Sequence, residues 1–171
     1  IKCALLMPFC LAMFAPSTAA EAASRNGQTR TTVSQAVSIT KNADLHFGDF
    51  AAGTSQSRFR LNPANDTVTQ LSGNAVPLGG SQTAASFTAF GTPLYRVRMT
   101  VNQNRIDLTR VGGTETMRVD QFRLDGGNGT RNRTLSASGS VEYKVGGRLT
   151  INAGQAGGAY AGTFNVNIDY Q

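Results

Sequence analysis

The chain has 171 residues and a formal net charge of +6, and only 15% of its residues are charged. An apolar content of 40% can fill a core, which argues against a disordered chain, and the low charge argues against a long helix or coiled coil. One histidine and two cysteines make most metal centres and histidine-dependent catalytic sites hard to build.

Residues 1–20 predict a secretory signal peptide. Lys2 precedes a run of apolar residues, and small residues follow that run. The run is shorter than the roughly 20 residues that cross a bilayer, so we expect cleavage between Ala20 and Ala22 and no membrane-spanning segment. The mature protein is therefore expected in the periplasm, at the cell surface or outside the cell, in a Gram-negative bacterium.

The polar residues 21–32 predict a flexible mature N-terminus, and residues 33–171 predict a single domain. Within that domain, apolar and polar side chains alternate in short segments, which is typical of half-buried strands. The alternating apolar residues are Val37 and Ile39; Phe59 and Leu61; Tyr95, Val97, Met99 and Val101; Ile106 and Leu108; Met117 and Val119; Phe122 and Leu124; Val141, Tyr143 and Val145; Leu149 and Ile151; and Phe164, Val166, Ile168 and Tyr170.

Two local features refine this strand pattern. The alternation changes parity between Val119 and Phe122, which predicts a β-bulge near Asp120 and Gln121. Glycine pairs, among them Gly146-Gly147, predict turns between strands. We therefore expect an all-β fold: an immunoglobulin-like antiparallel β-sandwich of about eight or nine strands, similar to pilins and adhesins.

Four segments resemble a family of secreted bacterial proteins that is known only as a domain of unknown function. These segments are Val37-Ser-Ile-Thr-Lys-Asn-Ala-Asp-Leu-His-Phe-Gly48, Ala84-Ala-Ser-Phe-Thr-Ala-Phe-Gly91, Met117-Arg-Val-Asp-Gln-Phe122 and the stretch from Val145 to Tyr170. They occur in the family's order and cover most of the domain. The resemblance implies no particular activity.

The C-terminal segment also resembles the subunits of chaperone–usher pili. Tyr170 is the penultimate residue of the sequence, and Gly158 is the fourteenth from its end. The resemblance implies that Gly158, Phe164, Val166, Ile168 and Tyr170 contact a strand added by a periplasmic chaperone or by a neighbouring subunit. A sandwich whose last strand is central would show the same alternation.

Self-polymerisation is not expected from this sequence. A subunit that donates a strand needs several alternating apolar side chains in its N-terminal extension, and residues 21–32 offer none. A terminal or accessory subunit, or a complete surface domain, fits the sequence better.

Three pairs of arginines at i, i+2 predict a cationic sheet face if their strands are neighbours. The pairs are Arg58 and Arg60, Arg96 and Arg98, and Arg131 and Arg133. Residues two apart on a strand face the same way, and we expect these pairs to point away from the apolar side. Such a face can bind an anionic glycan, although it can equally be a solvated surface. Aromatic residues do not alternate with these arginines, so no specific nucleic-acid partner is expected.

Candidates for catalysis are weak. His46 has no serine or cysteine in a nucleophile motif nearby, and the carboxylate pairs Asp44 with Asp49 and Asp120 with Asp125 are more typical of turns and exposed strands. No enzymatic activity, metal or cofactor is expected. The sequence favours a structural or adhesive surface protein that acts through strand and surface contacts, with a monomeric module for anionic glycans as the alternative.

Overall fold

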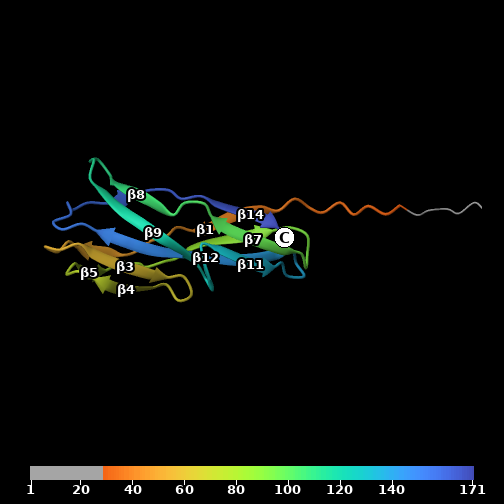
Figure 1. The fold of residues 1–171 in the computed structure, drawn as a ribbon, viewed down its shortest axis with the longest axis horizontal. Coiled ribbons are helices and arrows are strands. Elements are labelled where there is room, and N and C mark those ends of the chain that lie inside the picture. The colour runs from red at the N-terminus through yellow and green to blue at the C-terminus, as the bar shows by residue number, and fades with distance from the viewer. Residues whose placement is uncertain (1–28) are drawn as a thin grey trace, which may run out of the picture. The chain divides into compact units, whose positions relative to one another are not determined.

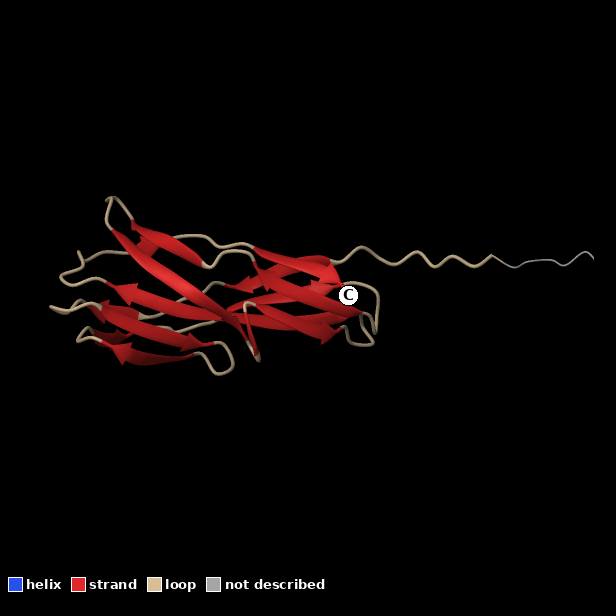
Figure 2. Cartoon of the chain, viewed as in Figure 1, coloured by secondary structure: helices blue, strands red, loops and turns tan. Residues whose placement is uncertain are grey.

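A computed structural model describes residues 29–171, and the predicted signal peptide lies outside the described residues. Residues 33–171 form one compact unit. The described part of the chain contains strands and loops and no helix (Figure 2), so the all-β class is confirmed. It also contains no helix of the length and apolarity that crossing a membrane would require. Of the polar N-terminal stretch, residues 29–32 are described, and they are exposed and outside any strand.

The largest sheet has nine antiparallel strands, and β12 (Ser140–Ile151) lies at its centre (Figure 1). The order along its main path is β1-β6-β12-β9-β8-β13, while β3 also pairs with β12 and β4, and β10 pairs with β9. The other strands of this sheet are β1 (Ser38–Ala43), β3 (Ser57–Asn62), β4 (Thr67–Ser72), β6 (Ala85–Phe90), β8 (Arg105–Arg110), β9 (Thr116–Leu124), β10 (Gly127–Asn128) and β13 (Tyr160–Ala161).

A sheet of three strands, in the order β11-β7-β14, shares the apolar core with the large sheet. Its strands are β7 (Arg96–Val101), β11 (Thr130–Thr134) and β14 (Val166–Tyr170), and a separate pair consists of β2 (Asp49–Ala51) and β5 (Val76–Gly79). Val97 and Met99 of β7 and Tyr143 of β12 are fully buried in one cluster. The Tyr143 hydroxyl donates a hydrogen bond to the Val97 carbonyl over 3.2 Å, which links the two sheets.

The glycine pair inside β12 is a correction to the sequence prediction. Gly146 and Gly147 do not form a turn, because the strand continues through both of them. A Cβ atom on Gly146 would lie 2.3 Å from the Leu61 carbonyl oxygen, so the backbones approach too closely there for any side chain. On one edge, β12 therefore passes from β6, which pairs with Ser140–Val145, to β3, which pairs with Arg148–Ile151.

The predicted bulge in β9 is confirmed. Asp120 lies opposite Arg148 and Arg123 lies opposite Gly146, so two residues of β9 face one residue of β12. Gln121 has a φ of 47° at this point. The extra residue lets Val119 and Phe122 both point into the core despite their different parity.

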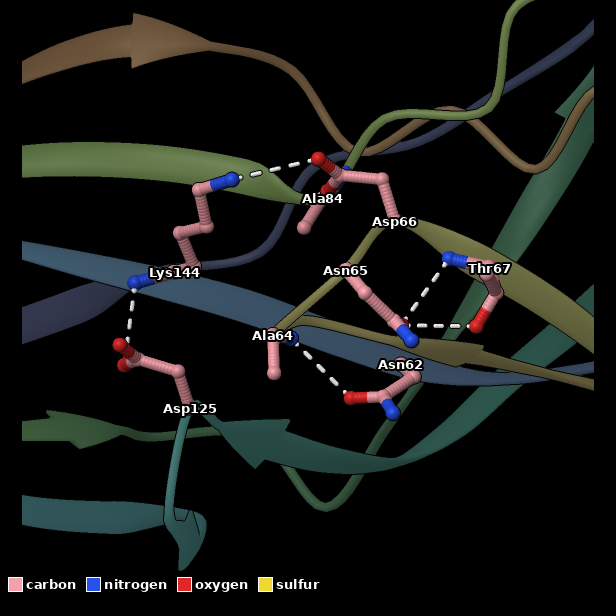
Figure 3. A network of polar contacts seen from close by, with 8 residues as sticks. All are labelled: Asn62, Ala64, Asn65, Asp66, Thr67, Ala84, Asp125 and Lys144. Carbon is pink, nitrogen blue, oxygen red and sulfur yellow. Dashed lines mark hydrogen bonds and ion pairs between the residues drawn. The ribbon is translucent and has the colours of Figure 1, made fainter.

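A network of polar contacts fixes the β3–β4 turn to the centre of the sheet (Figure 3). Asp66 has a φ of 57°, accepts a hydrogen bond from the Ala84 amide over 2.8 Å and pairs with the Lys144 ammonium at 3.2 Å. The Ala84 amide and Lys144 together hold the pKa of Asp66 below its usual value. The Lys144 amide in turn donates to the Asp125 carboxylate. One carboxylate thus ties β4, β6 and β12 together.

Candidate functional site

The C-terminal strand β14 is an edge strand in the described part of the chain. Among residues 29–171, β7 is its only strand partner. Its apolar residues Val166, Ile168 and Tyr170 are half-buried, and the residues opposite them on β7 are buried. The alternation predicted from the sequence is therefore present, but one neighbouring strand covers these side chains incompletely.

Strand β1 is an edge strand of the large sheet, and both of its ends lie near the C-terminal segment that contains β14. The Tyr170 hydroxyl donates a hydrogen bond of 2.6 Å to the carbonyl of Gln35, just before β1. At the other end of β1, Lys41 lines a cavity together with Phe164, just before β14. The two strands therefore run in opposite directions along what we call the open side, the side of the domain between the free edges of β1 and β14 (Figure 1).

A groove with an apolar floor extends along this part of the domain. It consists of two cavities of about 410 Å³ and about 280 Å³ that share Leu45, Phe47, Leu108 and Tyr160. Residues 41–50 line one side and residues 158–164 line the other, while residues of β6, β8, β9 and β12 form the floor.

Phe164 and Tyr170 fix the two ends of the C-terminal segment. The Phe164 ring stacks on Phe122 with 5.0 Å between the ring centroids and meets the edge of Phe87 at 6.2 Å. The Tyr170 hydroxyl also accepts a hydrogen bond from the Thr92 amide over 2.8 Å. The segment between these aromatic residues is thus held in place from both ends, although one edge of it has no strand partner.

Gly158 lies apart from the other predicted partner-strand contacts. It lies in the loop before β13 and lines the smaller cavity, whereas Phe164 lines the larger one. Its φ is 142°, and a Cβ atom there would lie 2.8 Å from the Nε atom of Arg110. The positive φ favours glycine at this position, because other residues rarely adopt this backbone conformation.

The three arginine pairs do not lie on one surface. Arg58 and Arg60 are on the outer face of the large sheet, and the exposed Arg96 and Arg98 are on β7 of the other sheet. β11 does pair with β7, but its arginines lie opposite the buried Val97 and Met99. The expectation that every pair points away from the apolar side is therefore wrong for Arg131 and Arg133.

Internal contacts account for the inward orientation of the β11 arginines. Arg133 forms an ion pair with Asp125 and donates a hydrogen bond to the Glu142 carbonyl. Its guanidinium also lies 5.4 Å from the centre of the Tyr143 ring. Burial raises the pKa of the Tyr143 hydroxyl. Arg131 donates to the Gly126 carbonyl, so both arginines help to close the side of the domain that β11 occupies.

Cross-strand pairing places two further arginines beside Arg58 and Arg60. Arg58 lies opposite Thr150, which lies opposite Arg118, and Arg60 lies opposite Arg148. Neither Arg118 nor Arg148 belongs to an i, i+2 pair of arginines, so the sequence pattern gives no sign of either. Only the register between β3, β12 and β9 shows that they are neighbours.

The weak catalytic candidates lie in structural contacts. The Nδ1 atom of His46 is 2.6 Å from the Ser81 carbonyl oxygen, and Asp44 pairs with Lys41 at 2.7 Å. Asp120 binds Arg148 through two hydrogen bonds of 2.7 and 2.9 Å, which raise the pKa of Arg148. Across residues 29–171, no three His, Cys, Asp or Glu side chains are grouped to hold a metal ion.

The chain belongs to a protein family described as a domain of unknown function (DUF4402), whose match covers residues 37–170. This match confirms the family resemblance found in the sequence. No curated protein and no solved structure matches the chain. The description of the family names no activity. The features that bear on function are therefore the open side and the surfaces of the two sheets.

Proposed function

We propose that this protein is a secreted bacterial surface protein with a structural or adhesive, fimbria-like role, and that it accepts a β-strand of another polypeptide beside β14. The observation that carries the proposal is the edge of β14, which has no second strand partner among the described residues, so that Val166, Ile168 and Tyr170 remain half-buried. The groove with the apolar floor begins at Phe164, just before this strand. Export through the predicted signal peptide is part of the proposal.

The backbone groups and side chains of β14 indicate what kind of segment can bind beside it. An edge strand leaves a row of backbone N–H and C=O groups without protein partners, and another strand satisfies all of them at once. Side chains two residues apart are half-buried on β14, so the added strand needs apolar side chains with the same alternation. The occupant is therefore an extended, alternating segment of a periplasmic chaperone or of a neighbouring subunit.

The chain's own N-terminal stretch does not fit this role. Residues 21–32 contain no alternating apolar set, and the part of this stretch that the structure describes, residues 29–32, is exposed. The donor strand is therefore expected to come from another protein, which assigns this chain the part of a terminal or accessory subunit.

A synthetic peptide tests strand addition directly. A nine-residue peptide that alternates Val or Ile with Thr or Ser is added to the purified mature protein, and the melting temperature is measured. We expect it to rise with peptide concentration, because a ligand that binds only the folded state stabilises it by RT ln(1 + [L]/Kd). A peptide of the same composition with its apolar residues in adjacent pairs serves as the control and should leave the temperature unchanged.

A variant locates the effect on β14. Ile168→Glu should abolish the stabilisation by the peptide, whereas Leu71→Glu, at an exposed position on β4, should retain it. Hydrogen exchange of the β14 amides should slow when the alternating peptide is bound. Equal stabilisation by both peptides, or unchanged co-purification of partners after deletion of residues 163–171 in the source bacterium, would contradict the proposal.

A further inference from the structure

The outer face of the large sheet carries charged residues in two rows that cross the strands. One row contains Arg58, Thr150, Arg118 and Asp107, on β3, β12, β9 and β8. The next row contains Arg60, Arg148, Asp120 and Arg105 on the same four strands. The rows together hold five arginines and two aspartates, which leaves an excess of three positive charges on one face.

The two arginines beside Thr150 form no ion pair within the described part of the chain, although Asp107 lies on the strand next to Arg118. Among the described residues, neither Arg58 nor Arg118 has a carboxylate oxygen within 4.0 Å. Arg148 differs, because Asp120 binds it through two hydrogen bonds and compensates its charge. The excess charge of the first row is therefore concentrated on the two guanidinium groups that flank Thr150.

A polar cavity of about 150 Å³ lies over this part of the sheet. Arg58, Arg118 and Arg148 line it, together with Thr150 and Asn152. Thr150 is only 8% exposed although it lies on the outer face, which places it at the floor of the cavity between the arginines. Gln56 accepts a hydrogen bond of 3.1 Å from Arg58 and holds that guanidinium at the rim.

We propose that this cavity binds an oxyanion group, a carboxylate or sulfate, of an acidic polysaccharide. Neighbouring strands are about 4.8 Å apart, so the backbones of Arg58 and Arg118 are about 10 Å apart and their side chains can converge above Thr150. Guanidinium groups bind planar and tetrahedral oxyanions through paired hydrogen bonds. Asp107 and Asp120 also line the cavity, so its three arginines and two aspartates leave one net positive charge, which matches a single monovalent anionic group.

The surroundings favour a glycan over a nucleic acid. The eight residues of the two rows include no aromatic side chain on which a base can stack. Arg60 and Arg105 in the second row extend the positive surface across the sheet, which suits a ligand with charges repeated along a chain. The site lies on β3, β9 and β12, so its function does not depend on strand addition at β14.

Binding of the full mature chain to heparin tests this site. The affinity is measured by calorimetry at several salt concentrations, with neutral dextran as the uncharged control. We expect heparin to bind, dextran not to bind, and Arg118→Gln or Arg58→Gln to weaken heparin binding about tenfold and to lower the salt dependence by about one charge. The double variant Arg96→Gln/Arg98→Gln removes two exposed arginines of the other sheet and should leave the affinity within twofold.

A variant without a charge change separates a formed site from diffuse attraction. Thr150→Val should weaken heparin binding several-fold while leaving the salt dependence and the circular dichroism spectrum unchanged. Absence of heparin binding would overturn the proposal, and so would equal losses in the Arg96/Arg98 variant. Single-stranded DNA that binds as tightly as heparin would overturn the assignment to a glycan.

Discussion

Strands β3 and β14 show nearly the same apolar alternation in the sequence, yet they are buried to different extents. β3 lies between β12 and β4, and its residues Phe59 and Leu61 are fully buried. β14 has one strand partner in the described part of the chain, and Val166 and Ile168 are half-buried. Alternation thus specifies which side chains face the core, while the number of neighbouring strands determines how completely these side chains are covered.

Truncation of one aliphatic side chain on each strand tests this comparison with the largest expected effect. Leu61→Ala should lower the free energy of unfolding by about 3–4 kcal/mol, because a fully buried leucine leaves a cavity. Ile168→Ala should cost only about 1–2 kcal/mol, since solvent already reaches that side chain. Urea denaturation of both variants measures the difference, and equal losses would mean that β14 is covered as well as β3.

A glycine substitution tests how closely the backbones pack at the β3 side. Gly146→Ala should destabilise the protein by about 2–3 kcal/mol, because the added methyl group would overlap the Leu61 carbonyl. Gly157→Ala is the matched control: a Cβ atom at this loop position would have no other atom within 4 Å, and the change should be neutral or slightly stabilising. Thermal unfolding of the two variants should separate them clearly, and a neutral Gly146→Ala would argue against the close approach of the Leu61 carbonyl to Gly146.

The smallest expected effect concerns the carboxylate that fixes the β3–β4 turn. Asp66→Asn should cost about 1 kcal/mol at neutral pH, because it weakens the hydrogen bond from Ala84 and removes the ion pair with Lys144. Asparagine tolerates the positive φ of this position, so the backbone is preserved.

The loss of stability in Asp66→Asn should depend on pH, because the wild-type carboxylate titrates. Because the folded pKa of Asp66 lies below its unfolded value near 4, its contribution is fully present above about pH 4. It is then lost as the pH falls through the lowered folded pKa. Denaturation of the wild type and of Asp66→Asn between pH 7 and pH 2 should give curves that converge in acid. A constant difference would show that the charge of Asp66 does not contribute.

The features that the sequence predicted correctly are local ones. Side-chain alternation indicated the strands and the all-β class, and the parity change at Asp120 and Gln121 indicated the bulge. The glycine pair Gly146-Gly147 predicts a turn in the sequence, and this prediction is wrong. Gly146 is required because the Leu61 backbone approaches it closely, and Leu61 lies far away in the sequence.

The candidate sites depend on pairing that a single sequence does not reveal. The apolar residues of β14 were predicted, but their incomplete burial follows from the absence of a second strand partner in the described residues. Of the two arginines that flank Thr150 on the outer face, the sequence predicts Arg58 as an anion-binding residue but not Arg118. Only the register of β3, β12 and β9 shows that the two arginines are neighbours. Arg131 and Arg133 face inward because Asp125 and Tyr143 bind Arg133, which alternation alone could not indicate.

The central position of β12 has a consequence for the order in which the protein folds. β3 and β6 are synthesised well before β12, and both pair with it along a single edge. Neither strand can complete its place in the sheet until residues 140–151 have been made. Contacts between such distant segments slow folding, so we expect the centre of the large sheet to form late. Until then, β3 and β6 each have a free edge that other polypeptides can reach.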